Sequence, residues 1–441
     1  MAKTAPQPHI PPTHENGHAT LLPAEDIPQK KSEETALEAE EIPQIPAEIQ
    51  ANTFIFDEFF DLEYAKSVAR FVITPIEQYY FRAEFVGFEG EDFPERNNPK
   101  HPLIFASNHS GMAFPWDGMI FASGLMRLND YHLRRATRGM ASPMLSKTKL
   151  MNPFLIPNFW KRVGGIDATM LNFETMMHYG QANVLIYPEG VPGIGKGFNR
   201  RYQLQRLSTS ALRLSIKYKT DIIPFATVNA EYINPFSYSI DWVNELVQKI
   251  GVPFLPLGPT LLLALLQPWM FYFAFPAKLI FVRGRRVKPY EMVDKSFEEL
   301  SQEEIIVLRD KIHSQMQVEL NRAVANYGTK PYHWGEFLRT IVQNWRKIPY
   351  FMPFAWPFIF IEHERRYQAL QAKLRKFGGD TPEDMAQRQA AFEDVHENED
   401  ESLMTMVKTA AKTIARNPEV LLFYVPIVGW IPTLVKGYQK E

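Results

Sequence analysis

The stretch "LIFASNHSGMAFPWDG" at residues 103–118 joins a short apolar run to a histidine, a tryptophan and an aspartate set among glycines. A histidine can take a proton from an alcohol as a general base. An aspartate on its other nitrogen fixes the tautomer and stabilises the imidazolium that forms. On one straight helix His109 and Asp117 would lie about 12 Å apart. Their contact therefore requires a turn, which Gly111 and Pro115 can supply.

Both residues also have structural interpretations. Asp117 could be only the N-cap of a helix expected at "GMIFASGLM", residues 118–126. His109 could be a hydrogen-bonded core residue. The pair by itself does not decide between these interpretations and catalysis.

Apolar runs of strand type alternate with helical stretches along the chain. The expected strands are residues 102–107, 183–189, 221–228 and 278–284. The expected helices are residues 167–180, 201–219, 290–326 and 362–416, and residues 54–87 read as one or two amphipathic helices running into a strand. This alternation predicts an α/β fold with a mostly buried sheet flanked by helices. Asn108, Glu189 and Asn229 lie near strand ends, where sites gather in open α/β sheets.

Composition excludes several kinds of chemistry. The 441 residues contain no cysteine, which excludes disulfides, thiolate catalysis and cysteine metal sites. The net charge of −2 is close to zero and does not indicate any class of binding partner. Residues 1–52 are acidic and rich in proline, with no sustained apolar period, so we expect a disordered tail without a cleaved secretory signal.

Three uncharged segments, residues 251–277, 348–361 and 420–435, contain many apolar side chains and are interrupted by prolines. Buried core helices are one interpretation. The prolines argue against spanning helices of about 20 residues, so we favour segments that insert into one face of a membrane. Residues 131–166 and 190–220 each carry seven bases and no acid, and we expect them to face phosphate or anionic lipid.

A second motif, "VLIYPEGVPGIGKGFNRRY", occupies residues 184–202. Its glycines and Lys196 approach a P-loop, but Gly197 stands where a magnesium-binding Ser or Thr belongs, and Glu189 places negative charge beside the loop. We therefore do not assign a nucleotide site. Sequences for a Gly-x-Ser-x-Gly elbow or a His-Glu-x-x-His zinc site are also absent.

Together these blocks resemble the phospholipid/glycerol acyltransferase family, which includes the lysophosphatidic acid acyltransferases. That family carries a His-four-residues-Asp block, a Phe/Tyr-Pro-Glu-Gly block and a later "IVPV"-like strand, here "IIPF" at residues 222–225. A Gly-rich block with an arginine is matched in part by "RVGGIDA" at 162–168. Seven residues, not four, separate His109 from Asp117, as in the diacylglycerol-acyltransferase-like branch. The resemblance covers roughly residues 60–325.

The resemblance implies direct acyl transfer from a thioester, acyl-CoA or acyl carrier protein, to a lipid hydroxyl, with no acyl-enzyme and no metal or redox cofactor. It implies that His109 is the base and that Asp117 orients it. Substrate binding is expected at residues of the same blocks: Asn108, Ser110, Glu189, Gly190, Lys196, Arg200 and Arg201. Glu189 could accept from a glycerol hydroxyl, and the arginines suit bidentate phosphate contact.

We therefore expect a membrane-associated O-acyltransferase on a cytoplasmic face, which acylates lysophosphatidic acid or another lysophospholipid. Its partners would be membrane lipids and the acyl donor, not nucleic acid, and the oligomeric state is left open. The expected domains are a tail at 1–52, an acyltransferase domain at 53–327 and a helical, membrane-associating region at 328–441. The alternatives are an enzyme for a neutral acceptor, such as diacylglycerol or a long-chain alcohol, and a catalytically silent lipid-binding or membrane-remodelling protein.

Overall fold

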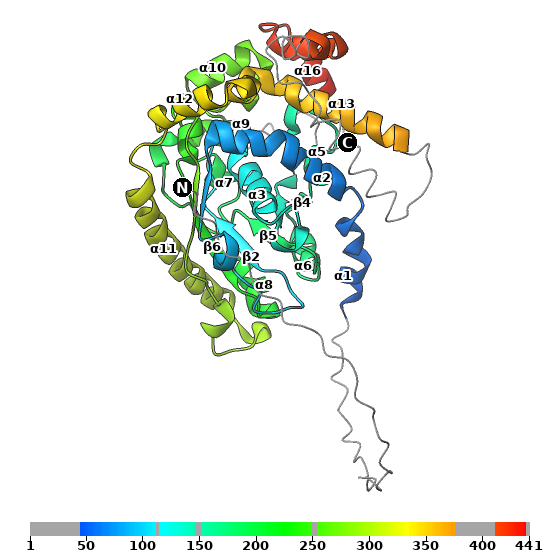
Figure 1. The fold of residues 1–441 in the computed structure, drawn as a ribbon. Coiled ribbons are helices and arrows are strands. Elements are labelled where there is room, and N and C mark those ends of the chain that lie inside the picture. Colours follow the sequence, from blue (N-terminus) through cyan, green and yellow to red (C-terminus); the bar gives the residue numbers. More distant parts are fainter. Residues whose placement is uncertain are drawn as a thin grey trace, which may run out of the picture. The chain divides into compact units, whose positions relative to one another are not determined.

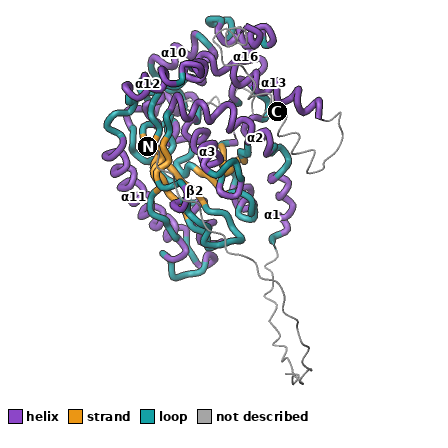
Figure 2. The backbone as a smooth tube through the Cα atoms, in the orientation of Figure 1, coloured by secondary structure: helices purple, strands orange, loops and turns teal. Residues whose placement is uncertain are grey.

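The computed structural model describes residues 45–111, 114–143, 145, 151–248, 254–374 and 411–437. A seven-stranded sheet lies at its centre, in the order β1-β7-β6-β2-β5-β3-β4 (Figures 1 and 2). Neighbouring strands are parallel except β6 and β7, which are antiparallel. The strands are β1 (Glu84–Val86), β2 (Ile104–Ser107), β3 (Thr137–Ala141), β4 (Ile166–Asp167), β5 (Asn183–Ile186), β6 (Ile222–Val228) and β7 (Ile280–Arg283).

Helices cover both faces of this sheet, which confirms the expected α/β fold (Figure 1). The α-helices are α1 (Ala47–Ala51), α2 (Leu62–Val68), α3 (Trp116–Leu128), α5 (Phe159–Arg162), α6 (Met170–Met176), α7 (Val191–Ile194), α8 (Ser210–Tyr218), α9 (Asp241–Gln248), α10 (Pro259–Leu266), α11 (Gln302–Tyr327), α12 (Trp334–Gln343), α13 (Trp356–Leu374) and α16 (Trp430–Gly437). Wider helical turns, Ala69–Ile73 and Ile76–Phe81, continue α2 towards β1.

Successive residues of the central strands face two different cores, because side chains alternate along a strand. Phe105 and Leu185 belong to the cluster that contains α3. Ile104 and Val184 belong to the cluster that contains α8 and α11. Burial on both faces explains why these strands read as continuous apolar runs in the sequence.

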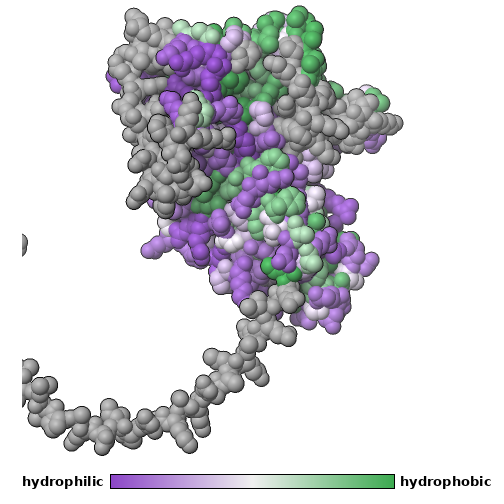
Figure 3. Space-filling view, turned by 90° about the vertical axis from the view of Figure 1, so that its right-hand side faces the viewer, coloured by the Kyte–Doolittle hydropathy of each residue, from purple (hydrophilic) through white to green (hydrophobic). Residues whose placement is uncertain are grey.

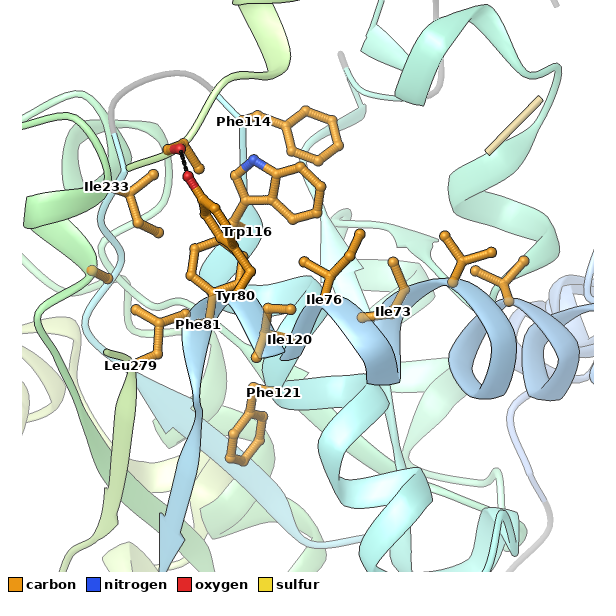
Figure 4. Close-up of a cluster of buried hydrophobic side chains, with 14 of the residues drawn as sticks. Ile73, Ile76, Tyr80, Phe81, Phe114, Trp116, Ile120, Phe121, Ile233 and Leu279 are labelled. Atoms are coloured by element: carbon orange, nitrogen blue, oxygen red, sulfur yellow. Dashed lines mark hydrogen bonds between the residues drawn. The ribbon is translucent and has the colours of Figure 1, made fainter. Parts of the chain in front are cut away.

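Trp116 is the central side chain of the first core, at the beginning of α3 (Figure 4). It is fully buried, and its ring lies 4.8 Å from the ring of Trp356 in α13. Its indole nitrogen donates to the carbonyl of Tyr272 at 3.1 Å. Figure 4 also shows Phe81, at the end of the helix that precedes β1, and Phe121 of α3 in this cluster. The beginning of α3 is therefore fixed by residues from both ends of the chain.

Helix α13 also contacts α2 directly, although about 300 residues separate the two in sequence. Ser67 and His363 are hydrogen-bonded at 2.7 Å, with a sequence separation of 296. Arg162 reaches Glu364 of α13 at 2.9 Å. Residues 328–374 thus pack on the same helices that cover the sheet. The domain boundary expected at 327 stays a prediction, and most of the expected tail lies outside the described residues.

The structure differs from the sequence prediction in two strands and in the beginning of one helix. Strands β3 and β4 were not expected, since β4 has two residues and β3 contains Arg138. The core can hold the buried Arg138 guanidinium because it donates hydrogen bonds to the carbonyls of Gly164 and Phe56. The helix predicted at 201–219 is wrong before residue 210. Residues 203–208 form neither helix nor strand there, and Ser208 donates its N–H to the carbonyl of Pro188.

A continuous apolar surface covers α10 and residues 421–435. The backbone N–H of Ile427 donates to Leu266, and the indole of Trp430 donates to Ala264, so the two segments lie side by side. We call this the apolar surface; its exposed side chains include Leu262, Leu263, Leu265, Leu266, Leu421, Val425, Ile427, Val428, Ile431, Leu434 and Val435. Hydrophobic residues gather at the upper end of the face in Figure 3, at the height of α10 and α16 in Figure 1.

Within the described part of the chain, we find no helix with both the length and the apolar character needed to cross a bilayer.

The two basic stretches do not form continuous basic surfaces, contrary to expectation. Arg138 and Lys196 are buried. Arg162 is paired with Glu364, and Lys217 with Glu174. Residues 144 and 146–150 of the first stretch lie outside the described residues. Much of this charge therefore balances charge inside the protein.

Gly124 of α3 tests the packing of the first core. A Cβ atom at this position would lie 2.0 Å from the ring of Phe85, whereas one at Gly335 of α12 would meet nothing within 4 Å. We expect Gly124→Ala to lower the free energy of unfolding by about 1–3 kcal/mol through overpacking. Gly335→Ala should be neutral or stabilise by up to about 1 kcal/mol. Urea unfolding of both variants measures this, and equal stability of the two would contradict the packing described.

Candidate active site

His109 and Asp117 are in direct contact at the carboxyl end of β2. The Nδ1 atom of His109 lies 2.8 Å from Oδ2 of Asp117. The turn that brings them together includes Gly111, whose φ of +115° favours glycine, and Pro115, which precedes α3. Because Asp117 bonds to Nδ1, the Nε2 atom of His109 is left as the proton acceptor.

Asp117 is completely buried in the first turn of α3. Its Oδ2 atom also accepts the N–H of Ser110 at 3.1 Å, and its Oδ1 atom accepts the N–H of Gly118 at 2.8 Å. The positive end of the helix dipole favours a carboxylate at this position. The His109 side chain is 13% exposed, so the imidazole is the partner that solvent or a substrate can reach.

Glu189 fixes the other side of the His109 loop. One carboxylate oxygen accepts the backbone N–H of His109 at 2.9 Å, and the other accepts the backbone N–H of Gln205. Burial raises the pKa of Glu189, while Lys196 and these two N–H groups act in the opposite direction. In this structure Glu189 positions the loop. Its expected contact with an acceptor hydroxyl stays a prediction.

Asn108 and Ser110, on either side of the histidine, are buried. The amide of Asn108 donates to the carbonyl of Thr227 at 2.9 Å and accepts the N–H of Thr227 at 2.8 Å. Asn108 therefore joins the end of β2 to β6. The hydroxyl of Ser110 is buried and has no hydrogen-bond partner in the described part of the chain, so it keeps its bonding capacity beside His109.

The remaining expected binding residues follow Glu189 but separate in space. Gly190 begins α7 with a φ of +61°, which favours glycine. Lys196 is buried, Arg200 is partly buried and Arg201 is exposed. Arg200 pairs with Asp241 at 2.8 Å. Arg201 lies over the ring of Phe198 at 4.9 Å. The three cations therefore do not form one phosphate-binding cluster in this structure.

Tyr187, at the end of β5, covers one face of the imidazole. Its ring lies 4.2 Å from the ring of His109 at an interplanar angle of 25°. The absence of a side chain at Gly118 leaves room for the phenol, since a Cβ there would lie 3.3 Å from its oxygen. Burial, together with the charge of Asp117, raises the pKa of Tyr187 well above its ordinary value, so the phenol stays protonated.

No role was predicted from the sequence for Tyr187 or for Glu231, which contacts Lys196 at 3.5 Å. Tyr187 precedes Pro188 and Glu189 in the second motif, and Glu231 follows Asn229 at the end of β6. Both positions carried the signal already used for Glu189, a polar residue just past a buried strand. What the sequence could not show is that these particular strands are neighbours of β2.

Residues 86–228 match the family model described as "Acyltransferase". This segment includes both motifs and five complete strands of the sheet, β2 to β6. The match gives the class of domain that contains His109, Asp117 and Glu189. Residues 86–228 therefore form a domain of an acyltransferase family, which confirms the resemblance to phospholipid/glycerol acyltransferases.

Two similar curated proteins come from mycobacteria. An uncharacterized protein of Mycobacterium leprae (strain TN) is 25% identical over 233 residues, which cover 51% of this chain and 58% of that protein. An uncharacterized protein of Mycobacterium bovis (strain ATCC BAA-935 / AF2122/97) is 25% identical over 231 residues, 50% of this chain and 59% of the relative. The chain thus spans less than two thirds of the length of these relatives.

One solved structure that matches is the 1-acyl-sn-glycerophosphate (LPA) acyltransferase, PlsC, of Thermotoga maritima. The match has a TM-score of 0.32 and 12% sequence identity, and it covers 62% of this chain and 87% of that chain.

The stacking of Tyr187 on His109 yields a test of imidazole positioning. We expect Tyr187→Leu to lower kcat for acyl transfer about tenfold or more with little change in KM, because a misplaced base affects the transition state more than binding. Tyr187→Phe keeps the ring and should retain most activity. Steady-state kinetics of both variants measure this. Equal losses in the two variants would assign the effect to the hydroxyl and contradict a role of the ring.

Proposed function

We propose that the protein is an O-acyltransferase that moves a fatty acyl group from a thioester to a hydroxyl of a lipid acceptor. The observation that carries the proposal is the 2.8 Å contact between His109 Nδ1 and the buried Asp117, in a domain of an acyltransferase family. That contact leaves Nε2 to act on the acceptor hydroxyl.

In the proposed reaction, Nε2 of His109 takes the hydroxyl proton as the acceptor oxygen attacks the thioester carbonyl. The new C–O ester bond forms and the C–S bond breaks. The leaving thiolate then takes the proton from the imidazolium, so the histidine returns to its neutral form. Asp117 stabilises the imidazolium between these two steps.

The same chemistry serves more than one acyl donor and more than one acceptor. An acyl-CoA or an acyl carrier protein would both present the thioester that this chemistry needs. A lysophospholipid such as lysophosphatidic acid is the acceptor expected from the sequence, with a neutral lipid alcohol as its alternative. The mechanism at His109 is the same for each of them, because only the hydroxyl reacts.

Variants of the dyad test the proposed reaction. We expect His109→Ala and Asp117→Asn to lower turnover of labelled acyl-CoA by about 10²- to 10⁴-fold, the range for loss of a positioned base. His132→Ala, at an exposed histidine, is the matched control and should keep wild-type turnover. Assays would use a panel of lysolipids and neutral acceptors, with circular dichroism to check folding. Wild-type turnover in His109→Ala would exclude His109 as the base. No transfer by the wild-type protein to any acceptor would favour the catalytically silent lipid-binding alternative.

We further propose that the apolar surface docks the protein on one face of a membrane, on the cytoplasmic side. The exposed side chains of α10 and residues 421–435 support this, since patches of this kind mark interaction sites. The neighbouring residues 337–361 carry three bases and no acid, which suits anionic head groups. Docking would let a lipid acceptor approach the protein without crossing water.

Charged substitutions test the docking surface. We expect Leu262→Glu combined with Ile431→Glu to weaken vesicle binding at least tenfold, because each buried apolar side chain contributes about 1.5–3 kcal/mol. Val307→Glu, at an equally exposed apolar residue of α11, is the matched control and should bind normally. High salt should weaken binding to anionic vesicles without abolishing it, since only the electrostatic part is screened. Unchanged binding of the double variant, or protection of one terminus across a sealed bilayer, would contradict docking on one face.

A further inference from the structure

Lys196 lies between two buried carboxylates close to the dyad. Its Nζ atom is 3.5 Å from Glu231 and 3.9 Å from Glu189. Lys196, Glu189 and Glu231 are each at least 96% buried. Because Glu189 also accepts the N–H of His109, the ammonium is one carboxylate away from the candidate base.

Asn234 closes this group of residues back onto the His109 loop. Its side-chain amide donates to the carbonyl of Gly111 at 2.6 Å. Its backbone N–H donates to the carbonyl of Glu231 at 3.3 Å. A closed chain of contacts therefore runs from the loop through two carboxylates and one ammonium and returns to the loop. We call it the polar ring; it consists of Gly111, Glu189, Lys196, Glu231 and Asn234, and we include Ser110 because it lies between His109 and Gly111 in the chain.

Four buried side-chain atoms of the polar ring have no hydrogen-bond partner among the residues that the structure describes. They are Ser110 Oγ, Lys196 Nζ, Glu231 Oε2 and Asn234 Oδ1. Buried polar atoms in native proteins nearly always have partners, so four such atoms in one set of linked residues indicate a polar ligand. One ammonium supplies donors, a carboxylate and an amide oxygen supply acceptors, and a hydroxyl can do either. A hydroxyl group of a ligand, which both donates and accepts, satisfies this mixed set.

The charge of the polar ring argues against a phosphate. Two carboxylates face one ammonium, so a phosphate would bring further negative charge into a buried site that already carries an excess of it. The other two cations expected to bind phosphate lie outside the ring: Arg200 is partly buried and paired with Asp241, and Arg201 is exposed. An uncharged head group avoids this repulsion.

We infer that the polar ring holds a second, unreacted hydroxyl of the acceptor, so that the acceptor is a neutral lipid polyol, of which monoacylglycerol is the simplest case. The inference rests on the proposed acyl transfer at His109. The reacting hydroxyl lies at His109 Nε2 and the second hydroxyl bonds within the ring. Ser110, a member of the ring, directly follows His109 in the chain. The phosphorylated acceptor expected from the sequence is then a poor substrate.

Matched acceptors with one acyl chain length separate the two classes. Monoacylglycerol carries two hydroxyls and no charge, lysophosphatidic acid carries one hydroxyl and a phosphate, and a long-chain alcohol carries one hydroxyl alone. We expect kcat/KM for monoacylglycerol to exceed that for either of the others at least tenfold, in wild-type protein with acyl-CoA. A preference for lysophosphatidic acid would overturn the inference.

Glu231→Gln tests the ring directly. We expect it to lower the ratio of kcat/KM for monoacylglycerol over the long-chain alcohol about tenfold, because it changes a contact that only the second hydroxyl makes. The ratio cancels a general loss of folded enzyme. Glu77→Gln is the matched control, since Glu77 is a buried glutamate paired with Arg127 outside the ring. It should leave the ratio unchanged.

The outcomes distinguish the two levels of proposal. An unchanged ratio in Glu231→Gln would overturn the role of the ring while acyl transfer itself stands. Transfer to no acceptor above the level of His109→Ala would overturn the proposed function, and the inference with it. A lowered ratio in Glu231→Gln together with an unchanged ratio in Glu77→Gln would support the polar ring as the acceptor site.

Discussion

Burial of the Asp117 carboxylate is the constraint on which the site depends. A buried charge is costly unless it is paired and hydrogen-bonded. Here His109, the N–H of Ser110 and the N–H of Gly118 all bond to it, at the positive end of α3. These bonds require the loop after β2 to fold back over the beginning of the helix. Trp116 holds that helix end in place by filling the core beneath it.

The order of the strands explains how distant residues reach this loop. Strand β2 lies between β5 and β6, and all three run in the same direction. Their carboxyl ends therefore meet at one edge of the sheet, which receives Glu189 from β5 and Glu231 from the segment after β6. Asn108 joins the same edge by its paired bonds to Thr227. The site is thus built from three chain segments that meet at one edge of the sheet.

The sequence was informative where one local pattern decides the outcome. Continuous apolar runs identified four strands because both faces of the sheet are buried. The contact between His109 and Asp117 followed from a glycine and a proline that permit the turn. The sequence did not reveal which residues far apart in the chain contact each other. The burial of Lys196 against Glu231 and the non-helical path of residues 203–208 depend on partners elsewhere in the chain, which local periodicity cannot reveal.

The bond between Ser67 and His363 has a consequence for the order in which the protein can form. During synthesis the N-terminal part of a chain emerges and begins to fold first. Helix α2 leaves the ribosome early, yet the residues of α13 that cover it are made almost 300 residues later. Until then its apolar face lacks its native cover, and non-local closure of this kind slows folding. The nascent chain therefore passes through a stage in which chaperones have a surface to hold.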